Sequence, residues 1–184
     1  EEFIADRYMK NTAFTGISAI EPYVFTEPWS ACLENKKVLV VHPFAESIKK
    51  QYAIHHKLFD NKKVLPDFEL KVIKAVQTIA GTVDDRFSNW FEALQYMKER
   101  MENTDFDVAI IGCGAYGMPL AIYAKQMGKQ AVHMGGATQI LFGIKGHRWD
   151  ENRTISNLYN EYWIRPNQSE TVEHQEKVEG GCYW

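Results

Sequence analysis

The 184-residue sequence has few cysteines, no long apolar run and no excess of basic residues. Its three cysteines, Cys32, Cys113 and Cys182, form no Cys-x-x-Cys pair, and their odd number predicts reduced thiols in a cytoplasmic protein rather than disulfides or a structural zinc site. The formal net charge of −3 argues against nucleic acid as a partner, because phosphate backbones attract a basic field. No apolar stretch approaches the roughly 20 residues that a membrane-spanning helix needs. A small molecule or another protein is the expected partner.

The length and the apolar content of 45% fit one compact domain rather than two. We expect a single α/β domain over residues 1–184, with an N-terminal extension over 1–35 and a core over 36–149. Residues 150–184 are expected to form a short helix near 154–163 and an aromatic tail that ends in Gly-Gly-Cys-Tyr-Trp. Because the sequence starts with Glu1 rather than Met, we also expect an upstream segment to be missing from it.

Strand-length apolar runs alternate with amphipathic segments along the core. The continuous apolar run 38–41 is typical of a strand that is buried on both faces of a parallel sheet. Strands are predicted at 36–44, 67–78, 106–112 and 129–136, and helices at 45–59, 85–103 and 118–127. A glycine loop lies between the predicted strand at 106–112 and the predicted helix at 118–127. The alternation predicts a Rossmann-like three-layer α/β sandwich with a mainly parallel sheet, in which ligands bind at the carboxyl ends of the strands.

The predicted helix at 85–103 carries an apolar stripe, and Asp85 or Ser88 is expected to cap its start. The stripe is predicted to pack in the core rather than to bind a cofactor. Its members lie three or four residues apart and are Phe87, Trp90, Phe91, Leu94, Met97 and Met101.

Gly112, Gly114 and Gly117 have the spacing G-x-G-x-x-G between a predicted strand and a predicted helix. This context is that of a dinucleotide-binding turn. In such folds the next strand ends in an acidic residue that binds ribose, but here it ends in Val132 and His133. The loop is therefore interpreted as a phosphate or diphosphate site rather than an NAD or FAD site, and glycines that serve helix packing alone remain the alternative.

Two histidines are expected at the same edge of the sheet. His42 ends the first predicted strand and His133 ends the fourth, and imidazole is the side chain that changes charge near neutral pH. Either one is a candidate general base, and the sequence leaves open whether one of them is buried and hydrogen-bonded. Ser47 lies at the start of the helix after His42, where it either binds an anion or caps the helix.

The segment 135–149 combines glycines with hydrogen-bond donors. The glycines permit close backbone approach, and the donors suit sugar hydroxyls or phosphate. The candidate binding residues here are Gly135, Gly136, Thr138, Gln139, Lys145 and Arg148, with Trp149 as a stacking surface. A polar surface loop is the alternative interpretation.

Two acid-x-acid pairs have the spacing of carboxylates that bind Mg²⁺ or Mn²⁺, namely Asp67 with Glu69 and Asp105 with Asp107. Both pairs precede predicted strands, so they are expected at the edge opposite the glycine loops and are interpreted as solvated strand starts. Cys113, inside the glycine loop, is interpreted as a small packed residue.

The segments GAYG at 114–117, GGATQ at 135–139 and FGIKG at 142–146 resemble the GT-D-fold glycosyltransferase-like domains, largely bacterial and viral proteins linked to surface-polysaccharide synthesis. The resemblance extends over residues 28–184. It implies a Rossmann-like domain that transfers a sugar from a nucleotide donor, with Mn²⁺ or Mg²⁺ held by an Asp-x-Glu motif near the N-terminus. This sequence departs from that pattern, because the segment before residue 36 offers only Asp6 and Arg7.

The leading hypothesis is a glycosyltransferase-like domain that binds a nucleotide sugar and transfers the sugar to an acceptor hydroxyl. Tyr116 and the three glycines of its loop would contact the diphosphate or the sugar, and Lys145 and Arg148 would neutralise phosphate charge. His42 or His133 would accept the hydroxyl proton. Two other classes stay open: a NAD(P)- or FAD-dependent oxidoreductase, and a non-catalytic binding or assembly module. Because the aromatic tail can pack on its own core or on a partner, a homo-oligomer is also open.

Overall fold

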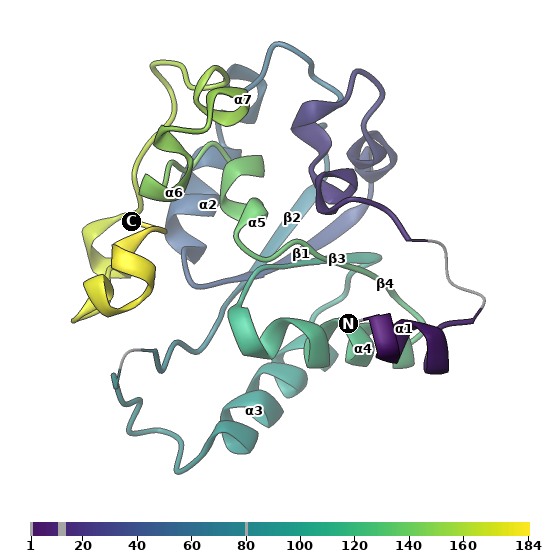
Figure 1. Ribbon diagram of the computed structural model, residues 1–184, viewed down its shortest axis with the longest axis vertical. Coiled ribbons are helices and arrows are strands. Elements are labelled where there is room, and N and C mark those ends of the chain that lie inside the picture. The colour runs from purple at the N-terminus through teal and green to yellow at the C-terminus, as the bar shows by residue number, and fades with distance from the viewer. Residues whose placement is uncertain (1, 11–13, 80) are drawn as a thin grey trace.

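A computed structural model of the protein describes residues 2–10, 14–79 and 81–184 (Figure 1). Its centre is a four-stranded sheet in the order β2-β1-β3-β4, in which every neighbouring pair of strands is parallel. The strands are β1 at Lys37–His42, β2 at Glu69–Lys74, β3 at Val108–Ile111 and β4 at Gln130–His133. The expected Rossmann-like α/β architecture is confirmed.

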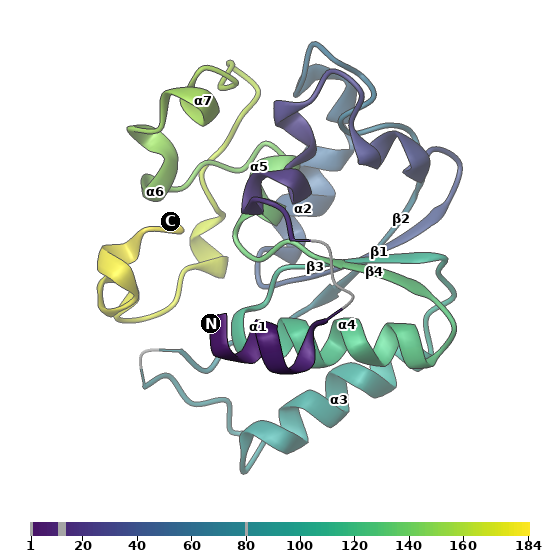
Figure 2. The ribbon, with the colours of Figure 1, turned by 45° about the vertical axis from the view of Figure 1, so that its right-hand side comes forward.

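Helices cover both faces of this sheet (Figure 2). Side chains alternate between the two faces of a strand, so each face of β1 and β3 contributes to a different core. On one side, Leu39 and Val41 pack with helices α3 (Trp90–Glu102) and α4 (Gly117–Gln126). On the other side, the intervening valines of β1 pack with α2 (Ala45–Tyr52) and α5 (Ala137–Leu141). The result is a three-layer sandwich.

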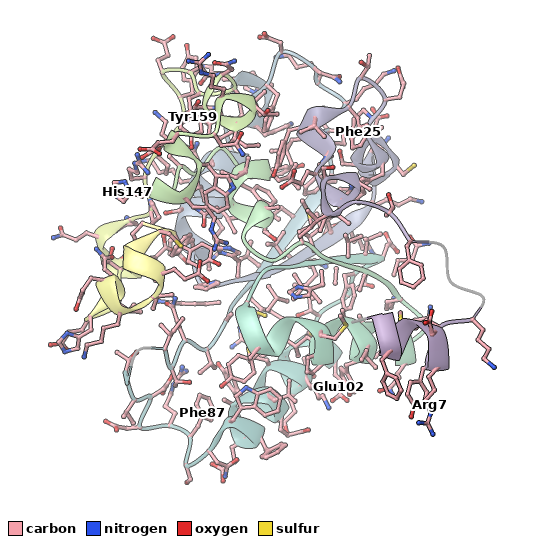
Figure 3. The ribbon with its side chains drawn as sticks, in the orientation of Figure 1. Arg7, Phe25, Phe87, Glu102, His147 and Tyr159 are labelled. Carbon is pink, nitrogen blue, oxygen red and sulfur yellow. The ribbon has the colours of Figure 1, made fainter. Side chains whose placement is uncertain are left out.

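The chain ends are built from short helical elements. The first is α1 at Glu2–Tyr8, and three 3-10 turns at Ile17–Ile20, Pro22–Val24 and Trp29–Leu33 lead into β1. After α5 come two short helices, α6 at His147–Asp150 and α7 at Arg153–Ser156 (Figure 3). Three 3-10 turns follow them, at Gln168–Glu170, Gln175–Lys177 and Glu179–Gly181. Trp163 and Trp184 from this C-terminal segment are buried in the same core as α2 and α5. Among the described residues, no helix combines the length and the apolar character that a membrane crossing requires.

Two expected helices are shorter than the sequence indicated. The helix after β1 stops at Tyr52, and a turn followed by a 3-10 turn at His55–Lys57 carries the chain into the buried residues Leu58 and Phe59. The helix expected near 154–163 is only α7. Beyond it, the Asn160 side chain accepts from the backbone N–H of residue 162 and donates to the carbonyl of residue 57, so local side-chain hydrogen bonds replace helical ones.

The start and the stripe of α3 also differ from expectation. Neither Asp85 nor Ser88 is the cap; Asn89 Oδ1 accepts the N–H groups of residues 91 and 92 at 3.0 and 3.1 Å. Met97 and Met101 are fully buried as expected, but Phe91 is 74% exposed. Adjacent residues on a helix point in directions about 100° apart, so one core face cannot hold Trp90 and Phe91 together.

Candidate functional site

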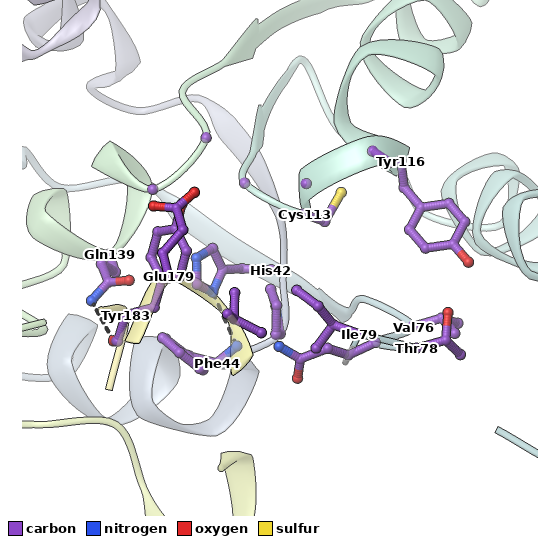
Figure 4. Close-up of a pocket in the computed structure, with 18 of the residues that line it drawn as sticks. His42, Phe44, Val76, Thr78, Ile79, Cys113, Tyr116, Gln139, Glu179 and Tyr183 are labelled. Atoms are coloured by element: carbon purple, nitrogen blue, oxygen red, sulfur yellow. Dashed lines mark hydrogen bonds between the residues drawn. The ribbon is translucent and has the colours of Figure 1, made fainter. Parts of the chain in front are cut away.

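A cavity of about 420 Å³ lies at the carboxyl ends of all four strands (Figure 4). The strand order reverses direction between β1 and β3, and in open α/β sheets ligands bind in the crevice at that switch point. The cavity wall comes from segments 42–44, 76–79, 112–116, 135–136, 178–179 and 183–184, together with Trp90, His133 and Gln139. The structure therefore brings the glycine loop, both histidines and the Gly135–Gly136 turn to one site.

The first two glycines of the loop permit two different features of the backbone. A Cβ atom at position 112 would lie 2.5 Å from Thr138 Oγ1 and 2.6 Å from the Gly135 carbonyl oxygen, so the loops after β3 and β4 touch through Gly112. Gly114 has φ +55°, a left-handed conformation that side chains other than glycine rarely adopt. Both residues line the cavity, but only Gly114 is exposed there; Gly112 is buried and its N–H donates to the Val41 carbonyl at 2.9 Å.

Gly117, the first residue of α4, does not line the cavity. A Cβ atom there would lie 2.2 Å from Cε1 and 2.6 Å from Nδ1 of the His133 ring. The glycine thus allows the imidazole to pack against the start of α4. The third glycine of the motif positions a histidine in this structure, rather than a pyrophosphate.

The hydrogen bond of His133 fixes the ring nitrogen that is available to a ligand. Its Nδ1 lies 3.1 Å from the carbonyl oxygen of Ile111, which can only accept a hydrogen bond. Nδ1 therefore carries the proton in the neutral ring, and Nε2 holds the lone pair. A ring in this state can accept a proton through Nε2.

His42 has the opposite arrangement. Its ring is 3% exposed, and Nδ1 accepts the backbone N–H of Phe44 at 3.0 Å, so the proton of the neutral ring is on Nε2 (Figure 4). Burial lowers the pKa of His42 from 6.5 to about 3. The expectation that His42 is a base near neutral pH is wrong, because desolvation keeps the ring neutral and its acceptor nitrogen is already occupied. It can offer a hydrogen bond through Nε2–H.

The segment after β4 contributes less to the cavity than its composition indicated. Gln139 lines the cavity, but its amide donates to the Tyr183 carbonyl at 3.1 Å and so holds the C-terminal tail. Neither Lys145 nor Arg148 lines the cavity: Lys145 lies over the ring of Tyr159, and Arg148 pairs with Glu179. Their expected role in neutralising phosphate charge inside this cavity therefore lacks a geometric basis.

Two further expected binding residues of this edge are interior ones. Thr138 is fully buried beneath Gly112, and its hydroxyl has no hydrogen-bond partner among the described residues. Trp149 is buried too, and its indole ring packs against the positions where Gly136 and Gly146 lack a side chain. The expected stacking surface for a sugar is thus part of the core.

Ser47 is bound by a carboxylate from the chain itself. The Glu170 side chain, 4% exposed, accepts the backbone N–H groups of Glu46 and Ser47 at 2.7 and 3.2 Å and also the Ser47 hydroxyl. It thereby satisfies the free N–H groups at the start of α2, where an external anion was one of the two expectations. Ser47 is buried and does not line the cavity, and its hydroxyl caps no N–H group of α2, so the Glu170 carboxylate takes the capping role that was expected of Ser47.

A family model for the GT-D fold-like domain matches residues 19–141, which include all four strands and the helices α2 to α5. The chain belongs to this family. No curated protein and no solved structure matches it. The matched region contains the glycine loop, both histidines and the turn after β4, whereas the tail that closes the cavity lies beyond it.

The divalent metal that the sequence resemblance implied remains a prediction, and the side chains that line this cavity do not form a ligand set for it. Within residues 2–10, 14–79 and 81–184, no group of three histidine, cysteine or acidic side chains is placed to hold a metal ion. The cavity offers a single carboxylate, Glu179, which pairs with Arg148. The acid pairs lie at the opposite edge as expected, where Asp105 pairs with Lys37.

The sequence pointed to Tyr116 as a cavity residue but missed the other aromatic side chains of the wall. Trp90 and Tyr116 stack with ring centroids 5.1 Å apart and an interplanar angle of 6° on one side. Tyr183 and Trp184 lie on the other side, and the Trp184 indole donates to the Glu170 carbonyl at 3.2 Å. The terminal Cys-Tyr-Trp was the one available signal, although it could not reveal which surface the rings cover.

Cys113 lines the cavity but is buried, and burial raises the pKa of its thiol to about 12. The thiol is therefore protonated at neutral pH, which agrees with the interpretation of a packed residue.

Proposed function

We propose that the cavity binds a nucleotide sugar and that the domain transfers the sugar to an acceptor hydroxyl in polysaccharide synthesis. The observation that carries the proposal is the position of the cavity, at the switch point of the sheet in a GT-D fold-like domain. Its volume of about 420 Å³ suits a small-molecule ligand.

The diphosphate is expected beside the turn that Gly112 and Gly114 form before α4. Gly114 and Ala115 are the exposed residues of this turn that line the cavity, and the N-terminus of α4 favours negative charge. The His42 ring adds a hydrogen-bond donor at Nε2 on the same side. Tyr116 contributes its ring to the wall, while its hydroxyl is buried and has no partner among the described residues.

His133 is proposed as the general base. The oxygen of the acceptor hydroxyl attacks the anomeric carbon of the donor and forms the new C–O bond, while His133 Nε2 takes the hydroxyl proton. The bond between the anomeric carbon and the diphosphate oxygen breaks, and its electron pair leaves with the nucleoside diphosphate. The hydrogen bond from Nδ1 to Ile111 holds the ring in the tautomer that this step needs.

The face of Trp90 is the proposed platform for the nucleobase. Stacking of a base on an aromatic ring is worth about 1 to 3 kcal/mol, so Trp90→Leu is expected to weaken nucleotide-sugar binding about tenfold. Phe91→Leu is the matched control, because Phe91 is the next residue of α3, is exposed and does not line the cavity.

The test is isothermal titration of the protein with UDP-, GDP- and CMP-sugars, with and without Mn²⁺. At least one donor is expected to bind, and its affinity is expected to fall in Trp90→Leu but not in Phe91→Leu. His133→Ala is expected to lower turnover more than donor affinity, whereas His147→Ala, an exposed histidine outside the cavity, is expected to change neither. Absence of binding heat for every donor, or an unchanged rate in His133→Ala, contradicts the proposal.

A further inference from the structure

A second cavity, also of about 420 Å³, adjoins the first one. The two cavities share Val76 and Gln77, the residues that follow β2. The wall of the second cavity is otherwise formed by the end of β2, residues 84–86, α3 and the segment 169–172. The two cavities are therefore neighbours that meet at the Val76–Gln77 segment.

Three cationic side chains line this second cavity, namely Lys74, Arg86 and Arg100. Arg86 forms a two-pronged ion pair with Asp84, at 2.8 and 2.6 Å. Within the described part of the chain, neither Lys74 nor Arg100 forms an ion pair with a carboxylate. The cavity thus has more positive than negative charge of its own.

The remaining acid of the wall, Glu170, does not correct this excess. Its carboxylate is buried and is bound by the first backbone N–H groups of α2 and by the Ser47 hydroxyl. The charge of Glu170 is therefore directed toward α2, and Asp84 is the one acid in the wall that pairs with a cavity cation.

Tyr96, another residue of the wall, contacts both guanidinium groups. The Cζ atoms of Arg86 and Arg100 lie 5.4 and 5.9 Å from the centroid of its ring, and Arg100 also donates to the Tyr96 hydroxyl at 3.4 Å. Planar guanidinium groups match phosphate and carboxylate oxygens in pairs, which favours these two chemical groups as ligands.

The first cavity lacks such charge, since no lysine or arginine is among its lining residues. We propose that the second cavity is an oxyanion subsite, which binds a phosphoryl or carboxylate group of a ligand that extends from the first cavity. The identity of that ligand rests on the proposed function: the group belongs either to an acidic acceptor or to the donor, whose diphosphate would then lie here rather than beside the glycine turn. The subsite itself can be tested without either.

The experiment titrates the full chain with inorganic pyrophosphate at low ionic strength and follows binding by calorimetry. The wild-type protein is expected to bind, and Arg100→Gln and Lys74→Gln are each expected to weaken binding at least fivefold. Arg153→Gln is the matched control, because it removes the same charge from an exposed residue of α7 that lines neither cavity. No binding by the wild type, or equal losses in Arg100→Gln and Arg153→Gln, overturns the proposal.

A second titration of the same variants with a nucleotide sugar identifies the source of the anion. A parallel loss of donor affinity in Arg100→Gln assigns the subsite to the donor diphosphate. Unchanged donor affinity, together with weaker pyrophosphate binding, assigns it to an acidic acceptor. If no nucleotide sugar binds to the wild type, the proposed function fails while the pyrophosphate titration still decides the subsite.

Discussion

Replacement of Gly117 by alanine tests how closely the glycine loop and His133 depend on each other. Position 117 has φ −61° and ψ −51°, an ordinary helical conformation, so alanine is not strained there. In a helix this substitution normally stabilises a protein by about 0.5 to 1 kcal/mol. The new Cβ atom, however, would lie 2.2 Å from Cε1 of His133, well inside van der Waals contact.

The imidazole therefore has to move, and its hydrogen bond with the Ile111 carbonyl, 3.1 Å long, is lost or stretched. Overpacking costs about 1 to 3 kcal/mol. The hydrogen bond adds about 1 kcal/mol. After the helix propensity of alanine is subtracted, Gly117→Ala is expected to lower the free energy of unfolding by about 1 to 3 kcal/mol.

Urea unfolding, with the midpoint and the slope fitted separately, measures this change. The same substitution in a His133→Ala background is the control, because the ring that causes the clash is then absent. There Gly117→Ala is expected to stabilise by about 0.5 to 1 kcal/mol, so the two substitutions should show a clear coupling energy. If Gly117→Ala is as stable as the wild type when His133 is present, Gly117 is not required by the packing of the ring.

Three further predictions follow from buried polar groups. Because the folded pKa of His42, about 3, lies below its ordinary value of 6.5, the unfolded chain binds the proton first, so the free energy of unfolding should fall as the pH drops below 6.5. The free energy of unfolding should be about 2 kcal/mol lower near pH 5, as measured by urea unfolding at a series of pH values. If it falls with pH as steeply in His42→Asn as in the wild type, His42 is not the cause. Cys113, with its raised pKa, should react with iodoacetamide at least tenfold more slowly than the exposed Cys32 at pH 8; equal labelling by mass spectrometry contradicts the burial of that thiol. Glu170→Ala leaves buried donors at Ser47 without an acceptor and should destabilise by about 3 kcal/mol in thermal or urea unfolding, whereas Glu170→Gln, which keeps one acceptor oxygen, should cost less.

The fold was accessible from the sequence because its signals are local. The run Val38–Val41 is apolar at every position, as a strand between two helical layers must be, and each such run is followed by a turn and a helix. The rule for parallel sheets then predicted the edge at which the loops after β1, β3 and β4 meet. The cavity lies at that edge.

The partners of the individual side chains were not accessible, because they are distant in the sequence. The sequence left two roles open for Ser47, a helix cap and an anion ligand. In the structure its N–H and its hydroxyl donate to the carboxylate of Glu170, which lies 123 residues away. Likewise, the spacing of the glycines does not show what packs against each of them. At Gly117 it is the ring of His133 and not a ligand. Lys145 and Arg148 were predicted to line the cavity, but Tyr159 and Glu179 from the C-terminal segment contact them instead.

The C-terminal segment lines both cavities, although it lies outside the region that the family model matches. The matched region ends at residue 141, yet Glu179, Tyr183 and Trp184 form one wall of the first cavity, and residues 169–172 form part of the second. Glu170 fastens this segment to α2, and Gln139 fastens the tail to α5. The sheet edge therefore supplies the features expected of the family, whereas the tail sets the size of the first cavity and part of the wall of the second. A substitution of Glu179, which lines the first cavity from an exposed position, should consequently change ligand binding before it changes stability, whereas Trp184 belongs to the core as well.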